Sequence, residues 1–338
     1  MYGLAGGINL KKALKTTQRV VDVIFIFIFI VIIVSGVVCK FIPGKKADYS
    51  KLSNPYITTD KALVSAHRSG KDIAPENTML AFETCIESEN FDVDIFEFDL
   101  HITKDGKLIL LHDNTLDRTT DSEEVFGEEG VTASEKTYEE LRTLNFGADF
   151  CNKEGEYPYR NLKEDEIPDN LRAVLLEDVL DYLENNGGFD YIIEIKDAGV
   201  LGEKAADELY RILKEKDLLG RVIVGTFNGN VTRYMDEKYP DMMRSAGILE
   251  VCVFYFATTL DIEFEDGFFK YKALQIPNKG YYVFALASER IINYAHKNDI
   301  AVQYWTVNDP EDVKELNELG ADCIMSDDPD MAYDVING

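Results

Sequence analysis

The sequence predicts an α/β fold: a (β/α)8 TIM barrel with an insertion after the second strand, preceded by one N-terminal transmembrane helix. Short apolar runs alternate with helical patterns at the spacing of parallel strand–helix units. The chain has 338 residues, and the part behind its apolar N-terminal segment suits one barrel of roughly 250–290 residues. Acids, histidines and a lysine stand at or just past the ends of apolar runs, where such a barrel places its chemistry: His67, Glu97, Asp99, His112, Glu194 and Lys196.

The N-terminal segment predicts a membrane anchor. From Val23 to Cys39 the chain has 17 uncharged residues, and a start at Val20 gives about 20, enough to cross a bilayer at about 1.5 Å per residue. We expect a helix, because an isolated strand cannot satisfy its backbone in lipid. The chain then divides into a short basic segment, a transmembrane anchor, a linker and a barrel domain, at 1–19, 20–39, 40–56 and 57–338.

A cleaved signal peptide is the alternative for the apolar segment. Its apolar region normally has about 7–15 residues, which is shorter than here, and no clean small-x-small cleavage site follows. We therefore expect a single-pass membrane protein. Four basic residues lie on each side of the span, so charge separates the two orientations only weakly. We expect a cytoplasmic N-terminus, with the barrel domain on the outer side of the membrane.

The barrel elements follow from apolar runs bounded by turn residues. Strands are expected at 62–66, 93–100, 191–195, 222–226, 243–247, 273–276, 301–306 and 322–325. Helices are expected from a cap at Asn77 or Thr78 to about residue 88, and at 176–185, 203–216, 230–238, 288–298 and 309–319. Asp105 and Gly106 form a tight turn that leads into a hairpin extension at 107–111.

The segment 114–175 is long and uneven, with acidic clusters at 121–129 and 164–166. Insertions on the catalytic face of a barrel often shape access to the substrate. A disordered acidic loop is the alternative for this segment.

Three carboxylates predict a cation site. Glu97 and Asp99 are two residues apart, so a strand places both on one face. Such a pair repels unless a cation or a proton lies between, and Glu194 arrives from the next strand. Ligation by oxygen alone favours Mg²⁺ or Ca²⁺ over zinc. A network of salt bridges is the alternative.

Two histidines and two cations complete the candidate site. His67 and His112 both follow apolar runs, and an ordinary pKa of about 6.5 suits them to proton transfer. The planar fork of Arg68 can bind a phosphate oxygen. Lys196 can place a point charge beside the same phosphate.

Further residues near the expected strand ends have supporting roles. Glu76 follows Pro75 in a loop and can hold Arg68 or His67 in place. Trp305 can offer an aromatic wall to the alcohol part of a substrate, and Gln275 is a second candidate for substrate binding. Asp327 ranks lower, His101 could face the same cavity as Asp99, and His296 lies on an expected helix and is expected to be structural.

Five stretches together resemble the glycerophosphodiester phosphodiesterases in order and spacing. They are AHRSGKDIAPENTMLAF at 66–82, FEFDLHITKDGKLILLHDNTLDRTTD at 96–121, IEIK at 193–196, VQYWTVND at 302–309 and ADCIMSDDPD at 321–330. The resemblance runs from about residue 63 to 332. It implies a TIM barrel that hydrolyses glycerophosphodiesters to glycerol phosphate and an alcohol.

The resemblance also implies roles for the candidate residues. One divalent cation, Mg²⁺ or Ca²⁺, would bind to Glu97, Asp99 and Glu194. In the implied mechanism the glycerol 2-hydroxyl attacks phosphorus and water then opens a cyclic phosphate. His67 and His112 would be the acid and the base, with their order left open, and the phosphate would be bound by Arg68 and Lys196.

Three other functions compete with this one. A lysophospholipase D would use the same site on membrane lysolipids, and apolar stretches at 253–256 and 268–269 could then form a lip. A metal-free phosphatidylinositol lyase would leave Glu97, Asp99 and Glu194 unexplained. A catalytically inactive anchored binding protein would be expected to have lost one of the six site residues, and all six are present.

Charge and cysteine content restrict the partners. The net charge is −27, and residues 1–51 contribute +6, so the remainder of the chain carries −33. Such a surface repels nucleic acid phosphates, and we expect no nucleic acid partner. The expected partners are a small-molecule or lipid phosphodiester and the membrane itself. Five cysteines do not suggest a disulfide framework, and no pattern in the sequence specifies an oligomeric state.

Overall fold

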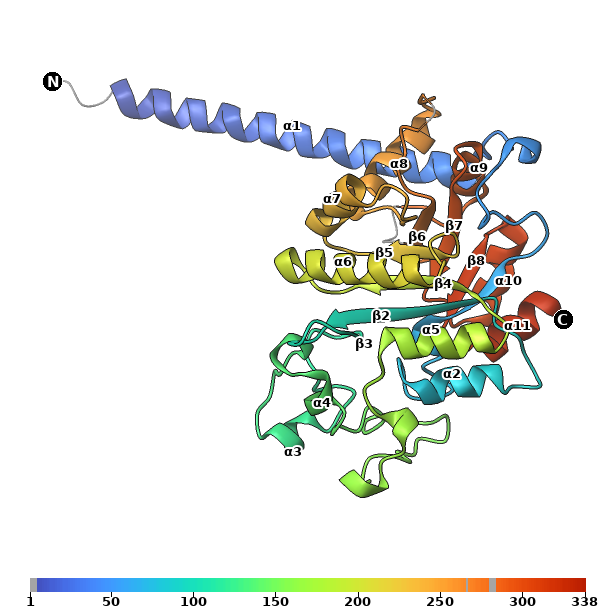
Figure 1. Cartoon of the computed structure of the whole chain (residues 1–338). Helices are drawn as coiled ribbons and strands as arrows, with labels where there is room; N and C mark the ends of the chain where they lie inside the picture. Colours follow the sequence, from blue (N-terminus) through green and yellow to red (C-terminus); the bar gives the residue numbers. More distant parts are fainter. Residues whose placement is uncertain (1–4, 266, 280–283) are drawn as a thin grey trace.

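The computed structural model describes residues 5–265, 267–279 and 284–338, with the side chains described from residue 13 onward (Figure 1). Parallel strands form a nearly closed barrel, in the order β5-β4-β2-β1-β8-β7-β6. Their bounds are β1 Leu63–Ala66, β2 Ile95–Ile102, β4 Asp190–Ile195, β5 Val222–Gly225, β6 Ala273–Pro277, β7 Ala301–Trp305 and β8 Cys323–Ser326. The expected TIM barrel is therefore confirmed.

The barrel closes through two single bridges where a regular strand was expected at 243–247. Arg244 pairs with Val224 of β5, and Ser245 pairs with Ala273 of β6. The segment is cut short because a helix begins at once: the Gly247 amide donates to the Glu250 carboxylate at 2.8 Å and caps α8. The position of the expected strand was correct, but its length was not.

The strands direct alternate side chains into the barrel and out towards the helices. Ile95, Ile192 and Ile223 fill the lower barrel interior together with Tyr56. Because strand side chains alternate with a period of two, Glu97 and Asp99 point into the same interior as Ile95, nearer the carboxyl ends of the strands. The β2 strand is buried on both faces, as expected for a parallel sheet covered by helices.

Helices surround the barrel: α2 Met79–Ile86, α5 Leu176–Asn185, α6 Gly199–Glu215, α7 Gly229–Lys238, α8 Ile248–Leu260, α9 Glu289–Lys297, α10 Pro310–Leu319 and α11 Pro329–Asn337. Thr78 caps α2 by accepting from the Ala81 amide, as predicted. Neither α8 nor α11 was expected from the sequence. The α8 sequence is apolar almost throughout, so it lacks the polar face that reveals an amphipathic helix.

The insertion after β2 is an ordered lobe. The hairpin strand β3 Leu108–Leu110 pairs antiparallel with β2. The lobe contains α3 Ser122–Phe126, α4 Tyr138–Leu141, η3 Ala133–Glu135, η4 Glu164–Glu166 and η5 Asp169–Leu171. Its own apolar cluster includes Leu116, Leu141, Leu144 and Phe146. The alternative of a disordered acidic loop is therefore wrong.

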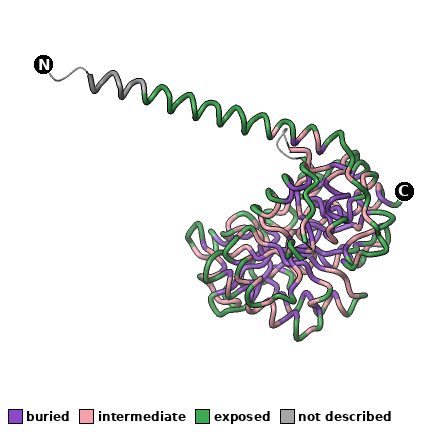
Figure 2. The backbone as a smooth tube through the Cα atoms, turned by 90° about the horizontal axis from the view of Figure 1, so that it is seen from above, coloured by how far each residue is buried: buried purple, intermediate pink, exposed green. Residues whose placement is uncertain are grey.

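The N-terminal helix α1 Ala5–Phe41 extends beyond both ends of the expected anchor. It leaves the barrel as a long exposed rod, shown in green in Figure 2. Of its residues from 13 onward, those of the last turns are docked, with Ser35 and Cys39 buried where α1 contacts α8 and α9. By length and composition Ala13–Phe41 can cross a membrane, and a signal sequence near an N-terminus meets the same criteria.

The segment behind α1 is irregular, as expected for a linker, but it is packed against the barrel. The Tyr49 hydroxyl, in the short helix η1 Tyr49–Lys51, lies 2.9 Å from Nδ1 of His296. Asp299 accepts from the Ser53 and Asn54 amides at 2.8 and 2.9 Å. These contacts fix the path of the chain between α1 and β1.

Candidate active site

Three carboxylates meet inside the barrel near the carboxyl ends of the strands. Glu97 and Asp99 come from β2, and Glu194 is paired in register with Asp99 on the neighbouring β4. Each offers one oxygen within 4.8 Å of the others. Burial and the charge of Asp99 raise the pKa of Glu97 above its ordinary value. Burial likewise raises the pKa of Glu194.

The chain after β1 makes a strained turn that aims His67 and Arg68 at these carboxylates. Arg68 and Ser69 adopt left-handed backbone conformations with φ of 49° and 66°. Such conformations in non-glycine residues cost about 1–3 kcal/mol each and concentrate at functional sites. In return, the Arg68 amide donates to Oε2 of Glu97 at 2.7 Å. Gly70 continues the turn with φ of 89°, which glycine adopts without strain.

His67 is held by a buried carboxylate. Its Nδ1 lies 2.6 Å from Oδ1 of Asp327, and its Nε2 lies 3.9 Å from Oε2 of Glu97. Burial lowers the pKa of His67, but the charge of Glu97 and the hydrogen bond to Asp327 outweigh burial, so the pKa lies above its ordinary value. Asp327 is fixed in turn by Lys71 at 3.0 Å and by the Asn308 side-chain amide at 2.6 Å.

His112 is held in the same way from the insertion side. Its Nδ1 lies 2.6 Å from Oδ1 of Asp113, and Oδ2 of the same carboxylate accepts from Nε of Arg118 at 2.5 Å. Arg118 donates to Glu76 at 2.7 and 2.9 Å, and Glu76 accepts from Arg68 at 3.1 Å. Burial lowers the pKa of His112 below its ordinary value. This chain of contacts connects His112 to Arg68 through Glu76.

Lys196 connects two of the carboxylates. Its Nζ lies 3.0 Å from Oδ1 of Asp99 and 2.9 Å from Oε2 of Glu194. Burial lowers the pKa of Lys196, but the charges of Asp99 and Glu194 outweigh it, so the pKa is raised. Asp99 also accepts from the Asn77 side-chain amide at 3.0 Å. The ammonium group is therefore permanently charged beside the carboxylate cluster.

The residues present fit a divalent cation. All three carboxylates offer oxygen ligands. Burial raises the pKa of Glu97 and Glu194, and repulsion from the charge of Asp99 raises both further. A hard cation would relieve this repulsion, and Mg²⁺ and Ca²⁺ both prefer such ligands.

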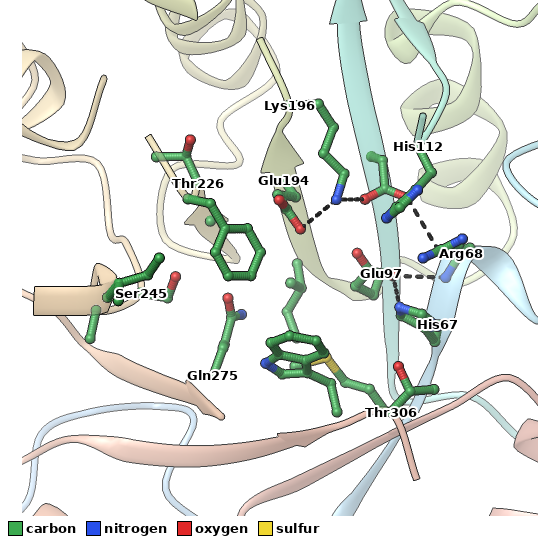
Figure 3. Close-up of a pocket in the computed structure, with 18 of the residues that line it drawn as sticks. His67, Arg68, Glu97, His112, Glu194, Lys196, Thr226, Ser245, Gln275 and Thr306 are labelled. Atoms are coloured by element: carbon green, nitrogen blue, oxygen red, sulfur yellow. Dashed lines mark hydrogen bonds and ion pairs between the residues drawn. The ribbon is translucent and has the colours of Figure 1, made fainter. Parts of the chain in front are cut away.

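The candidate catalytic, phosphate-binding, cation-binding and substrate-binding residues line one cavity of about 150 Å³, whereas Glu76 lies outside it. In Figure 3 the charged and histidine side chains gather on one side, and Thr226, Ser245 and Gln275 lie across from them. Trp305 also lines the cavity, where its ring packs edge-on to Phe227 with the centroids 5.9 Å apart. The cavity thus has a charged half and an uncharged half.

Two histidines lie outside this cavity. His101 does not share the cavity of Asp99, which corrects one expectation: its Nδ1 turns to Asp197 at 2.8 Å, in a neighbouring pocket. His296 is buried on α9 with Nε2 at 2.8 Å from Asp322, in keeping with a structural role.

Sequence reasoning assigned no role to Asp113, Arg118 or Phe227 and ranked Asp327 too low. The signal for Asp113 was present, since it directly follows His112. Arg118 lies in the LDRTT part of the stretch at 96–121 that resembles the family. Nothing in the sequence brings Asp327 to His67, because 260 positions separate them.

Known proteins resemble this chain over the whole barrel. A glycerophosphodiester phosphodiesterase from Caldanaerobacter subterraneus subsp. tengcongensis is 28% identical over 276 residues, which cover 82% of this chain and 98% of that protein. A phosphodiesterase of Oleispira antarctica, solved in complex with the product sn-glycerol-3-phosphate, superposes with a TM-score of 0.61 at 20% identity and covers 87% of this chain and all of that one. The corresponding domain of a Mycobacterium tuberculosis protein gives a TM-score of 0.64 at 18% identity, over 81% of this chain and 99% of that one.

A model of a whole protein family also matches the barrel domain. The profile described as "Glycerophosphoryl diester phosphodiesterase family" matches residues 67–331, from the first candidate histidine to the start of α11. It therefore includes every candidate site residue. This chain belongs to the glycerophosphoryl diester phosphodiesterase family and is a phosphoric diester hydrolase.

Proposed function

We propose that the protein hydrolyses glycerophosphodiesters to glycerol phosphate and an alcohol, with a divalent cation and two-histidine acid–base catalysis. The observation that carries this proposal is that two histidines held by carboxylates line the same cavity as three further carboxylates, of which Glu97 and Asp99 are buried and Glu194 is half-buried. In both His67 and His112 the Nδ1 atom is bonded to a carboxylate. The Nε2 atoms are therefore the ones available to move protons.

The charged half of the cavity suits a phosphodiester. Arg68 and Lys196 lie beside the carboxylates and would bind the phosphate oxygens. Glu97, Asp99 and Glu194 would hold Mg²⁺ or Ca²⁺, which would supply positive charge to a phosphate oxygen and lower the pKa of a bound hydroxyl. One histidine would take the proton from the attacking hydroxyl, and the other would protonate the leaving alcohol.

The uncharged half suits the organic part of the substrate. Trp305 and Gln275 line this half and would contact glycerol or the alcohol. The sn-glycerol-3-phosphate product in the Oleispira antarctica phosphodiesterase supports a glycerol phosphate in the site of this chain. Glu76 would position Arg68 through its contact at 3.1 Å, without touching the substrate.

We also infer that α1 anchors the enzyme as a single-pass membrane protein, with the barrel domain on the extracytoplasmic side. The helix is long and apolar enough to cross a bilayer. This favours a second substrate class, the lysolipids of the membrane, which a lysophospholipase D would cleave at the same site. An inactive binding protein is disfavoured because every candidate site residue is present.

Product release would test the proposal. The full chain, purified in detergent, is given glycerophosphocholine, glycerophosphoethanolamine and lysophosphatidylcholine, and the free alcohol and phosphomonoester are measured. We expect release that stops in excess chelator and returns with Mg²⁺ or Ca²⁺. Glu97→Gln should raise the cation concentration needed, whereas the matched change Glu177→Gln on the outer helix α5 should not. Full activity without detectable metal would contradict the proposed cation dependence.

A further inference from the structure

The anchor helix and the mouth of the cavity point to the same side of the molecule. In Figure 1 the arrowhead of β2 marks the carboxyl ends of the strands, and the free part of α1 extends beyond the barrel in that direction. Figure 2, turned about the horizontal axis, also shows the free part of α1 extending to the left, away from the barrel. The docked end of α1 fixes this arrangement, because Sγ of Cys39 lies 3.4 Å from Oγ1 of Thr259 on α8.

The length of the free part of α1 determines how close to the hydrocarbon core of the membrane the barrel must lie. Residues 13–31 are exposed, and the apolar part of this free segment begins at Val20. The 12 residues from 20 to 31 span only about 18 Å of a hydrocarbon core that is about 30 Å thick. The docked turns at 32–39 must supply the remaining ~12 Å. The surface of α8 beside these turns therefore lies within the membrane if α1 crosses it.

The exposed face of α8 suits that position. Leu249, Val253, Phe256 and Leu260 follow one another at helical spacing and are 80%, 50%, 38% and 71% exposed. The one charged residue of α8, Glu250, is paired with Arg244 at 2.7 Å. With 13 residues α8 is too short to span a bilayer. The exposed apolar side chains of α8 therefore form a surface that lipid beside α1 can cover.

This apolar surface continues to the mouth of the cavity. Ile248 begins α8, and Phe227 follows β5; both line the cavity and are more than half exposed. Val200 and Leu201 add exposed apolar side chains at the start of α6, which follows β4. Large apolar patches next to a binding site mark a surface that contacts a partner.

We propose that α8 and the rim formed by Phe227 and Ile248 are seated in the interface of the same bilayer that α1 spans, so that the cavity opens onto the membrane. The proposal rests on the anchoring role of α1 inferred above. It gives the exposed face of α8 a single occupant, the lipid of the leaflet next to the barrel. In this position the cavity is accessible to phosphodiesters that are held in the membrane by an acyl chain.

Lipid-quenching measurements on the full chain would test this. The exposed Cys151 and Cys252 are replaced by serine, single cysteines are introduced at Leu249 or Val253, and each is labelled with an environment-sensitive fluorophore. The protein is reconstituted in vesicles of phosphatidylcholine and phosphatidylglycerol that contain nitroxide lipids. Phe27→Cys in the free part of α1 reports insertion, and Asp178→Cys on the exposed side of α5 is the matched control.

We expect the labels at Leu249 and Val253 to be quenched to nearly the same extent as the Phe27 label, and several-fold more than the Asp178 label. Quenching at Phe27 without quenching at the α8 positions would overturn the inference and leave the anchor intact. No quenching at Phe27 would overturn the anchor and this inference with it. Protection of the α8 labels from both nitroxide lipids and aqueous iodide would assign this face to a second copy of the chain.

Activity supplies a second measurement. The double variant Leu249→Glu and Val253→Glu places two charges on the α8 face, outside the cavity lining. Cleavage of lysolipid in vesicles should fall at least about tenfold, while hydrolysis of soluble glycerophosphocholine should stay unchanged. An equal loss on both substrates, or on neither, would contradict a membrane role for this face. If the wild-type chain cleaved neither substrate, the proposed function would be contradicted. The quenching measurement would still test the membrane contact of α8, because it does not depend on activity.

Discussion

The contact between His67 and Asp327 makes the sharpest prediction. Asp327→Asn keeps the size of the side chain but removes the charge that lies 2.6 Å from Nδ1 of His67. Both side chains are buried, so water cannot replace the lost interaction. Burial raises the pKa of Asp327, but its hydrogen bonds to His67, Lys71 and Asn308 outweigh burial and hold it at about 2. The carboxylate is therefore ionised whenever the enzyme works near neutral pH.

The size of the effect follows from that contact. A hydrogen bond to a charged group contributes about 1.5–3 kcal/mol, and a loss of this size in the transition state lowers turnover about 10- to 150-fold. The pH profile should change as well. The charge of Asp327 helps to raise the pKa of His67, so its removal should lower that pKa. The limb of the pH–rate profile that reports His67 should therefore move to lower pH, whether His67 is the acid or the base.

The assay measures glycerol phosphate release across pH with saturating cation, so that kcat and KM are separated. Asp328→Asn is the matched control, because it is the same change one residue further on and contacts Lys153 and the Met331 amide outside the cavity. We expect kcat to fall in Asp327→Asn with little change in KM, and Asp328→Asn to keep the wild-type pH profile. A wild-type kcat and an unmoved limb in Asp327→Asn would refute the role given to this contact.

Three other predictions test the site and the fold. Removal of divalent cations should abolish turnover without unfolding the barrel, and Mg²⁺ or Ca²⁺ should restore turnover better than zinc. Activity retained after dialysis against chelator would exclude the three carboxylates as a cation site required for turnover. His112→Ala should lower kcat by about 10²–10⁴-fold with much less effect on substrate binding, and a near-normal kcat would remove His112 from the mechanism. The buried Arg244 donates to two carboxylates, those of Asp236 and Glu250. Asp236→Ala removes the two hydrogen bonds that Arg244 donates to Asp236, at 2.6 and 2.9 Å. This should cost about 1.5–3 kcal/mol of unfolding free energy, seen as a fall of several degrees in Tm; an unchanged Tm would show that Glu250 alone satisfies Arg244.

Much of the fold could be predicted because its signals are local. Strand side chains alternate with a period of two, so the sequence alone places Glu97 and Asp99 on one face of β2. Caps such as Thr78 depend on contacts three residues away and were also predictable. The helix α8 was not predicted because its sequence has no such local signal. Its apolar residues surround the helix, and no period separates a buried face from a face towards solvent or lipid.

The amino-acid sequence by itself determined the alternation of strands and helices, the residue types at the strand ends and the apolar N-terminal helix, because each depends on neighbours in the chain. Only the tertiary structure decided that Asp327, directly after the last strand β8, holds His67, whereas Asp113 holds His112 from the next position in the chain. It also decided that the end of α1 docks on α8 beside Thr259. These contacts join segments up to 260 positions apart, and barrel closure, which no local pattern encodes, brings them together.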